Sequence, residues 1–273
     1  PTPAVPFWPA GVFAWLILPL LGALLAVPAG HNLFELFTVA PGFNIWMTIF
    51  FGILWGVGGL TFGLSMRYLG VALGQSISLG TCAGLGTIMG PLLLDLFFPE
   101  LNALNALTIS VVIGVLVTLL GIGVIGYAGS LKVASLSDEE MKSAVSDFNF
   151  PKGLAIAILA GLMSGCFNVG LEFGKDINFG ADTPDMFKTL PATMLVTFGG
   201  FITNAIYCFY QNHKNGTWSD YRKGNVWINN LFFCVLAGAL WYSQFFGLSL
   251  AKGFLVESDT LMTLSFCILM ALN

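Results

Sequence analysis

The sequence contains little charge. Asp, Glu, Lys and Arg make up 9% of its 273 residues, whereas a soluble globular domain carries about 25%. This scarcity excludes an ordinary water-exposed surface, and the 56% share of hydrophobic residues supports the same conclusion. The net charge of −4 says little about partners, because the side on which loop charges lie matters more than their sum. We predict a polytopic membrane protein.

Several motifs of metal, nucleic-acid and enzyme chemistry are also missing. No basic tract suggests nucleic acid, and the two histidines, His31 and His213, fall in loops predicted on opposite sides of the membrane. No nucleophile with a base stands out, so we expect no catalytic residue, cofactor or metal. The cysteines lie in apolar segments without CxxC or Cys/His spacing. We expect them to be small buried hydrophobes: Cys82, Cys166, Cys208, Cys234 and Cys267.

Long stretches without any charged residue are abundant instead. They cover 1–34, 36–66, 68–94, 101–131, 153–171, 189–213, 224–251 and 260–273. Most exceed the ~20 residues that a helix needs to cross a bilayer, and they lack the alternation of barrel strands. We therefore predict an all-α polytopic membrane helix bundle. Its eight helices are expected at about 9–29, 44–66, 70–97, 106–127, 153–173, 190–211, 226–251 and 260–273.

Loop charges predict the orientation of these helices. Alternate loops contain seven of the ten basic residues: Arg67, Lys132, Lys142, Lys152, Lys214, Arg222 and Lys223. The positive-inside rule places these loops in the cytoplasm. The opposite loops contain Lys175, Lys188 and Lys252.

The segment 131–152 is expected to be a cytoplasmic linker between two repeats, 1–130 and 153–273. In it, Ser137-Asp138-Glu139-Glu140 forms a capping-box pattern that predicts a short surface helix from Met141 to Val145. The chain opens on Pro1, and its last apolar run is too short to span a bilayer. We expect a piece of a longer protein, with the first repeat lacking its first helix and the second truncated at its end.

One tetrapeptide occurs twice. Phe62-Gly63-Leu64-Ser65 and Phe246-Gly247-Leu248-Ser249 each lie near the end of an apolar segment, before Arg67 or Lys252. Chance alone gives roughly one such match in a chain of this composition, so position matters more than identity. The second copy lies five helices further along and crosses the bilayer in the opposite direction, as in inverted-repeat transporters.

Polar residues follow helical spacing on three segments, which places each set on one helix face. On 190–211 they are Thr193, Thr197, Gly200, Asn204, Tyr207 and Gln211. On 226–251 they are Asn230, Cys234, Ala237, Trp241 and Gln244, and on 153–173 they are Ser164, Asn168 and Glu172. Polar side chains in membrane helices usually face the protein interior.

Two interpretations of these faces remain open. Hydrogen bonding between packed helices, worth about 0.6 kcal/mol per bond, accounts for a single Thr or Ser. A solute site is an equal alternative for Asn204, Asn230 and Gln244, because a carboxamide in lipid is costly and neighbouring Trp241 resembles a sugar-stacking platform. The glycine-dense stretch 70–90, which includes Gln75, indicates either close helix packing or unwinding around a substrate.

Glu172 is the candidate proton-coupling residue. At ~1.5 Å per residue it lies about 30 Å along its helix from Lys152, near the outer rim. One interpretation is a solvated carboxylate. In the other, Glu172 faces a cavity with Asn168 one turn below, and burial favours a protonated form that can carry a proton.

Four segments closely resemble the L-rhamnose–proton symporter family of the drug/metabolite transporter superfamily: 62–70, 148–154, 199–204 and 239–246. The resemblance covers nearly the whole chain and implies ten helices in two inverted five-helix halves, with import of L-rhamnose and a proton into bacteria. The first helix here would be the family's second. Residues that look like family residues are Arg67, Lys175, Asn204, Asn230, Trp241 and Gln244. The role of Glu172 is inferred from its position alone.

The first hypothesis is therefore a monosaccharide importer of the bacterial inner membrane, coupled to protons and working by alternating access. Asn, Gln and Trp supply the hydrogen-bonding groups and aromatic face that a deoxyhexose needs. Expected substrate-binding residues are Gln75, Asn168, Asn204, Asn230, Trp241 and Gln244. The alternatives are a superfamily transporter of another sugar, an amino acid or a drug-like compound, and a membrane sensor. The expected partners are the sugar, the proton and the bilayer, without nucleic acid.

Overall fold

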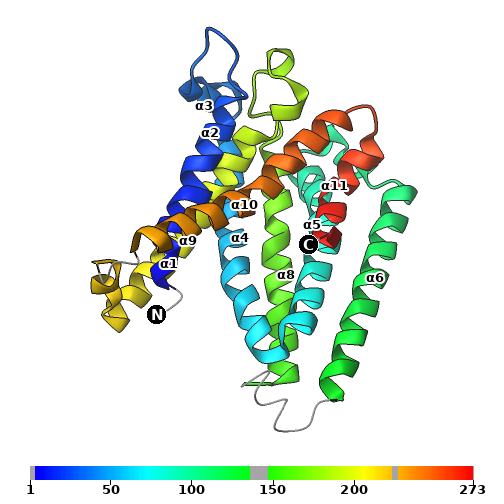
Figure 1. The fold of residues 1–273 in the computed structure, drawn as a ribbon. Helices are drawn as coiled ribbons and strands as arrows, with labels where there is room; N and C mark the ends of the chain where they lie inside the picture. Colours follow the sequence, from blue (N-terminus) through cyan, green and yellow to red (C-terminus); the bar gives the residue numbers. More distant parts are fainter. Residues whose placement is uncertain (1–3, 136–146, 223–226, 273) are drawn as a thin grey trace. The chain divides into compact units, whose positions relative to one another are not determined.

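The computed structural model describes residues 4–135, 147–222 and 227–272 (Figure 1). In this part of the chain the secondary structure is helical, with no strand. The long helices are α4 (Gly42–Leu69), α5 (Val71–Phe97), α6 (Ile109–Ala134), α8 (Phe150–Phe173), α9 (Leu190–Asn215) and α10 (Trp227–Phe254). Six helices of the described chain are long and apolar enough to span a membrane. The prediction of a polytopic helical membrane protein is confirmed.

Shorter helices occupy the two ends. The first expected helix is a continuous helical run of α1 (Ala4–Val12), the π-helix η1 (Phe13–Ile17) and α2 (Leu18–Leu24). The last is α11 (Asp259–Leu272), and α3 (Leu36–Val39) lies in the loop before α4. The number of helices in the whole protein remains a prediction.

Some predicted boundaries differ from the structure. The helix expected at 106–127 starts at Ile109, after the 3₁₀-helix η4 (Ala103–Ala106), and continues to Ala134. Its apolar sequence contains no proline that would end it earlier. Arg67 and Lys252, which were expected in loops, lie in the last turns of α4 and α10. The surface helix expected at Met141 to Val145 falls outside the described residues.

The chain divides into two compact units. Unit 1 comprises Pro1–Ile53 and Phe173–Phe254, and unit 2 comprises Leu54–Glu172 and Leu255–Asn273. Each unit takes segments from both halves of the sequence. The division into repeats on either side of 131–152 therefore remains a prediction about symmetry, separate from the division into units.

Glycines set the helix packing in unit 1, where α4 and α9 approach backbone to backbone. A Cβ added to Gly52 would strike the carbonyl oxygen of Val196, and one added to Gly199 would strike that of Ile49. Neighbouring α10 packs on the first helical run, with the Cβ position of Gly238 3.2 Å from the carbonyl oxygen of Ala10. Small residues of this kind let membrane helices pack closely.

Unit 2 is built around α5, which contacts α6 and α11 and packs closely on α8. The Cβ position of Gly165 on α8 is 3.0 Å from the backbone nitrogen of Gly86 on α5. The glycines of α5 lie against other side chains or backbone at Gly74, Gly80, Gly84, Gly86 and Gly90. Because α5 is helical from Val71 to Phe97, the structure supports the packing interpretation of this glycine-dense stretch over unwinding.

Candidate functional site

In unit 1, Trp241 lies in the middle of α10 and stacks on Trp15. The two ring centroids are 5.3 Å apart and the ring planes differ by 9°. Phe245, one turn further along α10, packs against Trp241 in a T-shaped arrangement at 5.0 Å. The aromatic platform expected at Trp241 is thus covered on one face by a second indole.

Trp15 is a residue that the sequence analysis missed. It belongs to the π-helix η1, in which the Leu18 N–H donates to the carbonyl oxygen of Phe13, five residues earlier. Pro19 follows Trp15 by four residues and cannot supply the N–H that an α-helix would direct to the Trp15 carbonyl. The four-residue spacing of Trp15 and Pro19 was therefore the sequence signal for a π-turn at Trp15. π-turns occur frequently at functional sites.

The carboxamides of unit 1 do not all gather at Trp241. Gln244 lies beside it on α10 and donates from Nε2 to the carbonyl oxygen of Trp241 at 3.0 Å. Asn230 lies three turns earlier, about 16 Å along the helix at ~1.5 Å per residue, and is exposed. Asn204 is buried on α9. The structure therefore brings together Trp241 and Gln244, with Asn230 apart from them.

The polar face of α9 bonds mainly to its own backbone. Thr193 and Thr197 are buried, and each donates its hydroxyl to the carbonyl four residues earlier at 2.9 Å. Asn204 Nδ2 donates to the carbonyl oxygen of Gly200 at 3.0 Å. Such back-bonding uses the hydroxyl protons within the helix, so the two threonines offer acceptors rather than donors to a solute or a neighbouring helix.

In unit 2, Asn168 and Glu172 lie one turn apart on α8, against the glycines of α5. Asn168 Nδ2 donates to the carbonyl oxygen of Gly86 at 2.9 Å, and a Cβ on Gly90 would lie 2.9 Å from Glu172 Cγ. Among the described residues, Asn168 Oδ1 is buried without a hydrogen-bond partner. Because position 90 is a glycine, the Glu172 side chain has room against α5. It lies one turn from Asn168, whose Oδ1 is the acceptor without a partner.

Gln75 is separate from this pair. It lines a cavity of about 210 Å³ between α5, α6 and α11. At ~1.5 Å per residue it lies about 16 Å along α5 from Gly86. Within unit 2, Asn168 and Glu172 thus lie one turn apart on α8, and Gln75 lies elsewhere.

Both copies of the repeated tetrapeptide end on a buried serine. Ser65 Oγ donates to the carbonyl oxygen of Phe62 and lies 3.3 Å from Ser78 Oγ on α5. Ser249 Oγ donates to the carbonyl oxygen of Met186 at 2.8 Å and accepts from Thr189 Oγ1 at 2.6 Å. Each serine therefore connects its helix to a neighbouring segment of its own unit.

The basic residues that follow the two copies differ. Arg67 is exposed and pairs with Asp147 at 2.6 Å, while Lys152 Nζ donates to the Tyr68 hydroxyl at 2.8 Å. Two of the segments that carry the family resemblance, 62–70 and 148–154, thus meet in unit 2. Lys252 is 7% exposed. Its position in the last turn of α10 suits a cation, because the carbonyl end of a helix carries partial negative charge.

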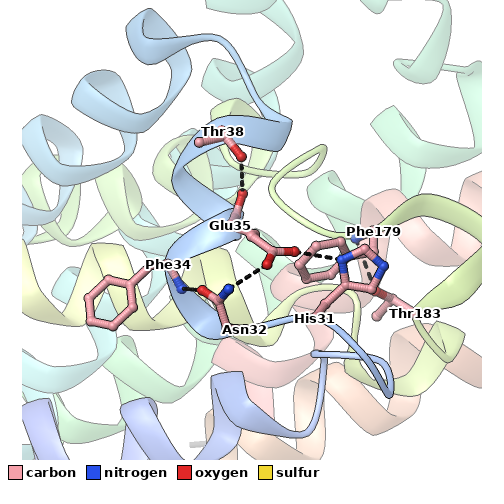
Figure 2. A network of polar contacts seen from close by, with 7 residues as sticks. All are labelled: His31, Asn32, Phe34, Glu35, Thr38, Phe179 and Thr183. Atoms are coloured by element: carbon pink, nitrogen blue, oxygen red, sulfur yellow. Dashed lines mark hydrogen bonds and ion pairs between the residues drawn. The ribbon is translucent and has the colours of Figure 1, made fainter.

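The loops of unit 1 form a further polar network, shown in Figure 2. His31 Nδ1 donates to Glu35 Oε2 at 2.6 Å, and Asn32 Nδ2 donates to the other oxygen of Glu35. Thr183 ties the loops more firmly, since its buried hydroxyl donates to the carbonyl oxygen of Ala26 at 2.9 Å and accepts from the Phe179 N–H. Lys175 lies in the same loop region and is exposed.

The five cysteines are free thiols. Four of them are buried, as expected of small apolar side chains, and Cys234 is half-buried. The long apolar helices, together with the polar groups buried in each unit, define the class: a multi-pass helical membrane protein.

Comparison with known proteins identifies the family. A family profile described as L-rhamnose-proton symport protein (RhaT) matches residues 6–271. The chain belongs to this family, whose members are transporters and not enzymes.

Similar proteins include two L-rhamnose-proton symporters, from Yersinia pestis bv. Antiqua (strain Antiqua) and Yersinia pseudotuberculosis serotype O:3 (strain YPIII). Each is 31% identical to this chain over 243 residues, which are 86% of this chain and 68% of the relative. No solved structure matches the chain. The resemblance noted in the sequence is confirmed.

Proposed function

We propose that the protein is a secondary active transporter that imports L-rhamnose together with a proton across the bacterial inner membrane. Family membership over residues 6–271 is the observation that carries this proposal. The Yersinia relatives bear the name L-rhamnose-proton symporter and suggest the bacterial inner membrane. Alternating access between two halves is the mechanism expected of such a protein.

The sugar is proposed to bind at Trp241 and Gln244, with Asn204 as a further contact. An indole offers a flat apolar surface to the C–H face of a pyranose, and a carboxamide offers both donors and an acceptor to its hydroxyls. The adjacency of Trp241 and Gln244 supports this assignment. Asn230, Asn168 and Gln75 remain candidates for contacts made in other states of the transport cycle.

Glu172 is proposed to carry the proton. A carboxylate can accept a proton and then become a hydrogen-bond donor, and Asn168 Oδ1 is a buried acceptor one turn away on the same helix. The carbonyl of Gly86 fixes the orientation of the Asn168 amide, because a flipped amide would place two oxygens against each other. A protonated Glu172 therefore has an acceptor available that an ionised Glu172 cannot use.

The two halves of the sequence are proposed to be inverted repeats. The equivalent positions of the Phe-Gly-Leu-Ser copies support this, since both serines are buried and both glycines, Gly63 and Gly247, have nothing within 4 Å of a Cβ position. The two copies thus match at the glycine and serine positions and differ at the leucine, since Leu64 is 38% exposed and Leu248 is 6% exposed.

Uptake by cells that express the full-length protein tests the proposal. Accumulation of labelled L-rhamnose should be abolished by a protonophore, and Trp241→Ala should reduce uptake at least tenfold with unchanged membrane abundance. Trp46→Ala is the matched control, because Trp46 is 71% exposed. Accumulation that survives the protonophore would refute proton coupling, and saturable uptake of another solute without L-rhamnose uptake would refute the substrate.

A further inference from the structure

We propose that Trp15 covers the sugar-binding face of Trp241 when no sugar is bound, and that an incoming monosaccharide takes its place. This inference rests on the proposed function, because it assumes that Trp241 is the stacking platform. It adds one residue, Trp15, and one motion to the proposed site. All the contacts that support it lie within unit 1.

The geometry makes Trp15 a competitor for the sugar. The indoles are nearly parallel, with planes 9° apart and centroids 5.3 Å apart, which is the arrangement that a pyranose ring would itself adopt on an aromatic face. Phe245 contacts the same indole. A sugar can therefore stack on the face of Trp241 that Trp15 covers only if Trp15 withdraws.

Trp15 is the neighbour that can withdraw independently of the Trp241 helix, because it lies on a different helical segment. Phe245 is 5% exposed and is fixed on the same helix as Trp241, whereas Trp15 is half-buried and belongs to a different segment. Its turn is a π-helix, which is wider than an α-turn and often occurs where helices change shape. Pro19 also denies the Trp15 carbonyl its usual α-helical donor.

A second observation points to a polar ligand beside this pair. The hydroxyl of Tyr242, next to Trp241 in sequence, is buried and has no hydrogen-bond partner among the described residues. It lies beside Gly22 of α2, with the Cβ position of Gly22 only 2.5 Å from Tyr242 Oη. Gly22 is two helical turns after Trp15. Movement of this helical run would therefore expose both an aromatic face and an unused hydroxyl.

Circular dichroism of the purified full-length protein tests the inference, since two stacked indoles give an exciton couplet in the far ultraviolet. The contribution of the Trp15–Trp241 pair should be present without sugar and should be lost in Trp15→Phe and in Trp241→Phe, whereas the second close pair, Trp8 and Trp218 at 6.3 Å, keeps its own contribution. The Trp15–Trp241 contribution should persist in Trp46→Phe, the matched control. Saturating L-rhamnose should abolish the Trp15–Trp241 contribution in the wild-type protein, with binding measured in parallel by calorimetry.

Affinity provides an independent readout. Removing a competitor should lower the Kd for L-rhamnose, so Trp15→Ala should bind about two- to tenfold more tightly, with Trp15→Phe in between. A Trp15–Trp241 contribution that persists while L-rhamnose binds would overturn the inference and leave the proposed function intact, and so would weaker binding by both variants. Absence of L-rhamnose binding would refute the proposed function, and the inference with it.

Discussion

Asn168 on α8 donates to the carbonyl oxygen of Gly86 on α5 at 2.9 Å, and its own carbonyl oxygen is left buried without a described partner. The amide nitrogen of Asn168 therefore links α8 to α5, and its amide oxygen is available as an acceptor. Glu172, one turn further along α8, is a candidate donor to this oxygen once it is protonated. This relationship leads to the first prediction.

Glu172→Gln should separate sugar movement from proton movement. The Gln side chain keeps the size of Glu, and its amide N–H mimics the donor of a protonated carboxyl. We expect exchange of labelled for unlabelled L-rhamnose to continue, while accumulation against a gradient is lost. Equal loss of exchange and accumulation would instead indicate a structural role for Glu172. Asp95→Asn is the control for removing a carboxylate near a helix end, because Asp95 lies in the last turn of α5 and accepts from the Leu104 N–H at 3.4 Å.

Ser249→Ala should destabilise the protein more than Ser243→Ala. Ser249 is 1% exposed and bonds to Met186 and Thr189, whereas Ser243 on the same helix is exposed and bonds to the carbonyl of Leu240. Loss of a hydrogen bond between membrane helices costs about 0.6 kcal/mol on average and up to about 1.7. Thermal unfolding in detergent measures the difference, and equal melting temperatures would contradict the assignment.

Glycines at close helix contacts should be far less replaceable than those that face open space. Gly199→Ala would push a methyl group into the backbone of α4 near Ile49, and overpacking of this kind costs about 1–3 kcal/mol. Gly63→Ala and Gly247→Ala meet nothing within 4 Å. They should be neutral or stabilise their helices by up to about 1 kcal/mol. Size-exclusion profiles after heating rank the three variants.

The loop network of Figure 2 should depend on Thr183 more than on the His31–Glu35 pair. Thr183 is 2% exposed and makes two hydrogen bonds to the backbone, so Thr183→Val leaves buried groups unsatisfied at a cost of about 1–3 kcal/mol. The side chains of His31 and Glu35 are 43% and 38% exposed, and exposed ion pairs contribute little. Limited proteolysis of the loops should therefore accelerate in Thr183→Val and hardly change in Glu35→Gln.

The helices could be predicted from the sequence because charge-free runs of membrane length have few alternative structures. Helical spacing also placed Asn168 and Glu172 on one face, and the structure finds them side by side against α5. The partner of each polar group could not be predicted. On α9 the helical spacing predicted the face that the polar residues share. Thr193 and Thr197 nevertheless donate to carbonyl groups of their own helix, because the partner of a hydroxyl depends on its side-chain rotamer and not on sequence order.

The contact between Trp15 and Trp241 could not be predicted, because nothing in their separation along the sequence indicates it. The stacking depends on how the first helical run packs on α10. Asn230 shows the opposite case. It shares the helical spacing of Trp241, yet lies three turns away and is exposed, because spacing fixes the face of a residue and not its depth.

A single residue, Gly70, connects α4 to α5. Its φ of +79° suits glycine and reverses the chain within one residue, and the Cβ position of Gly74 lies 3.0 Å from the backbone of Met66. The one-residue connection and this close packing couple the end of α4 to the start of α5. We therefore expect these two helix ends to move together in any conformational change on that side of unit 2.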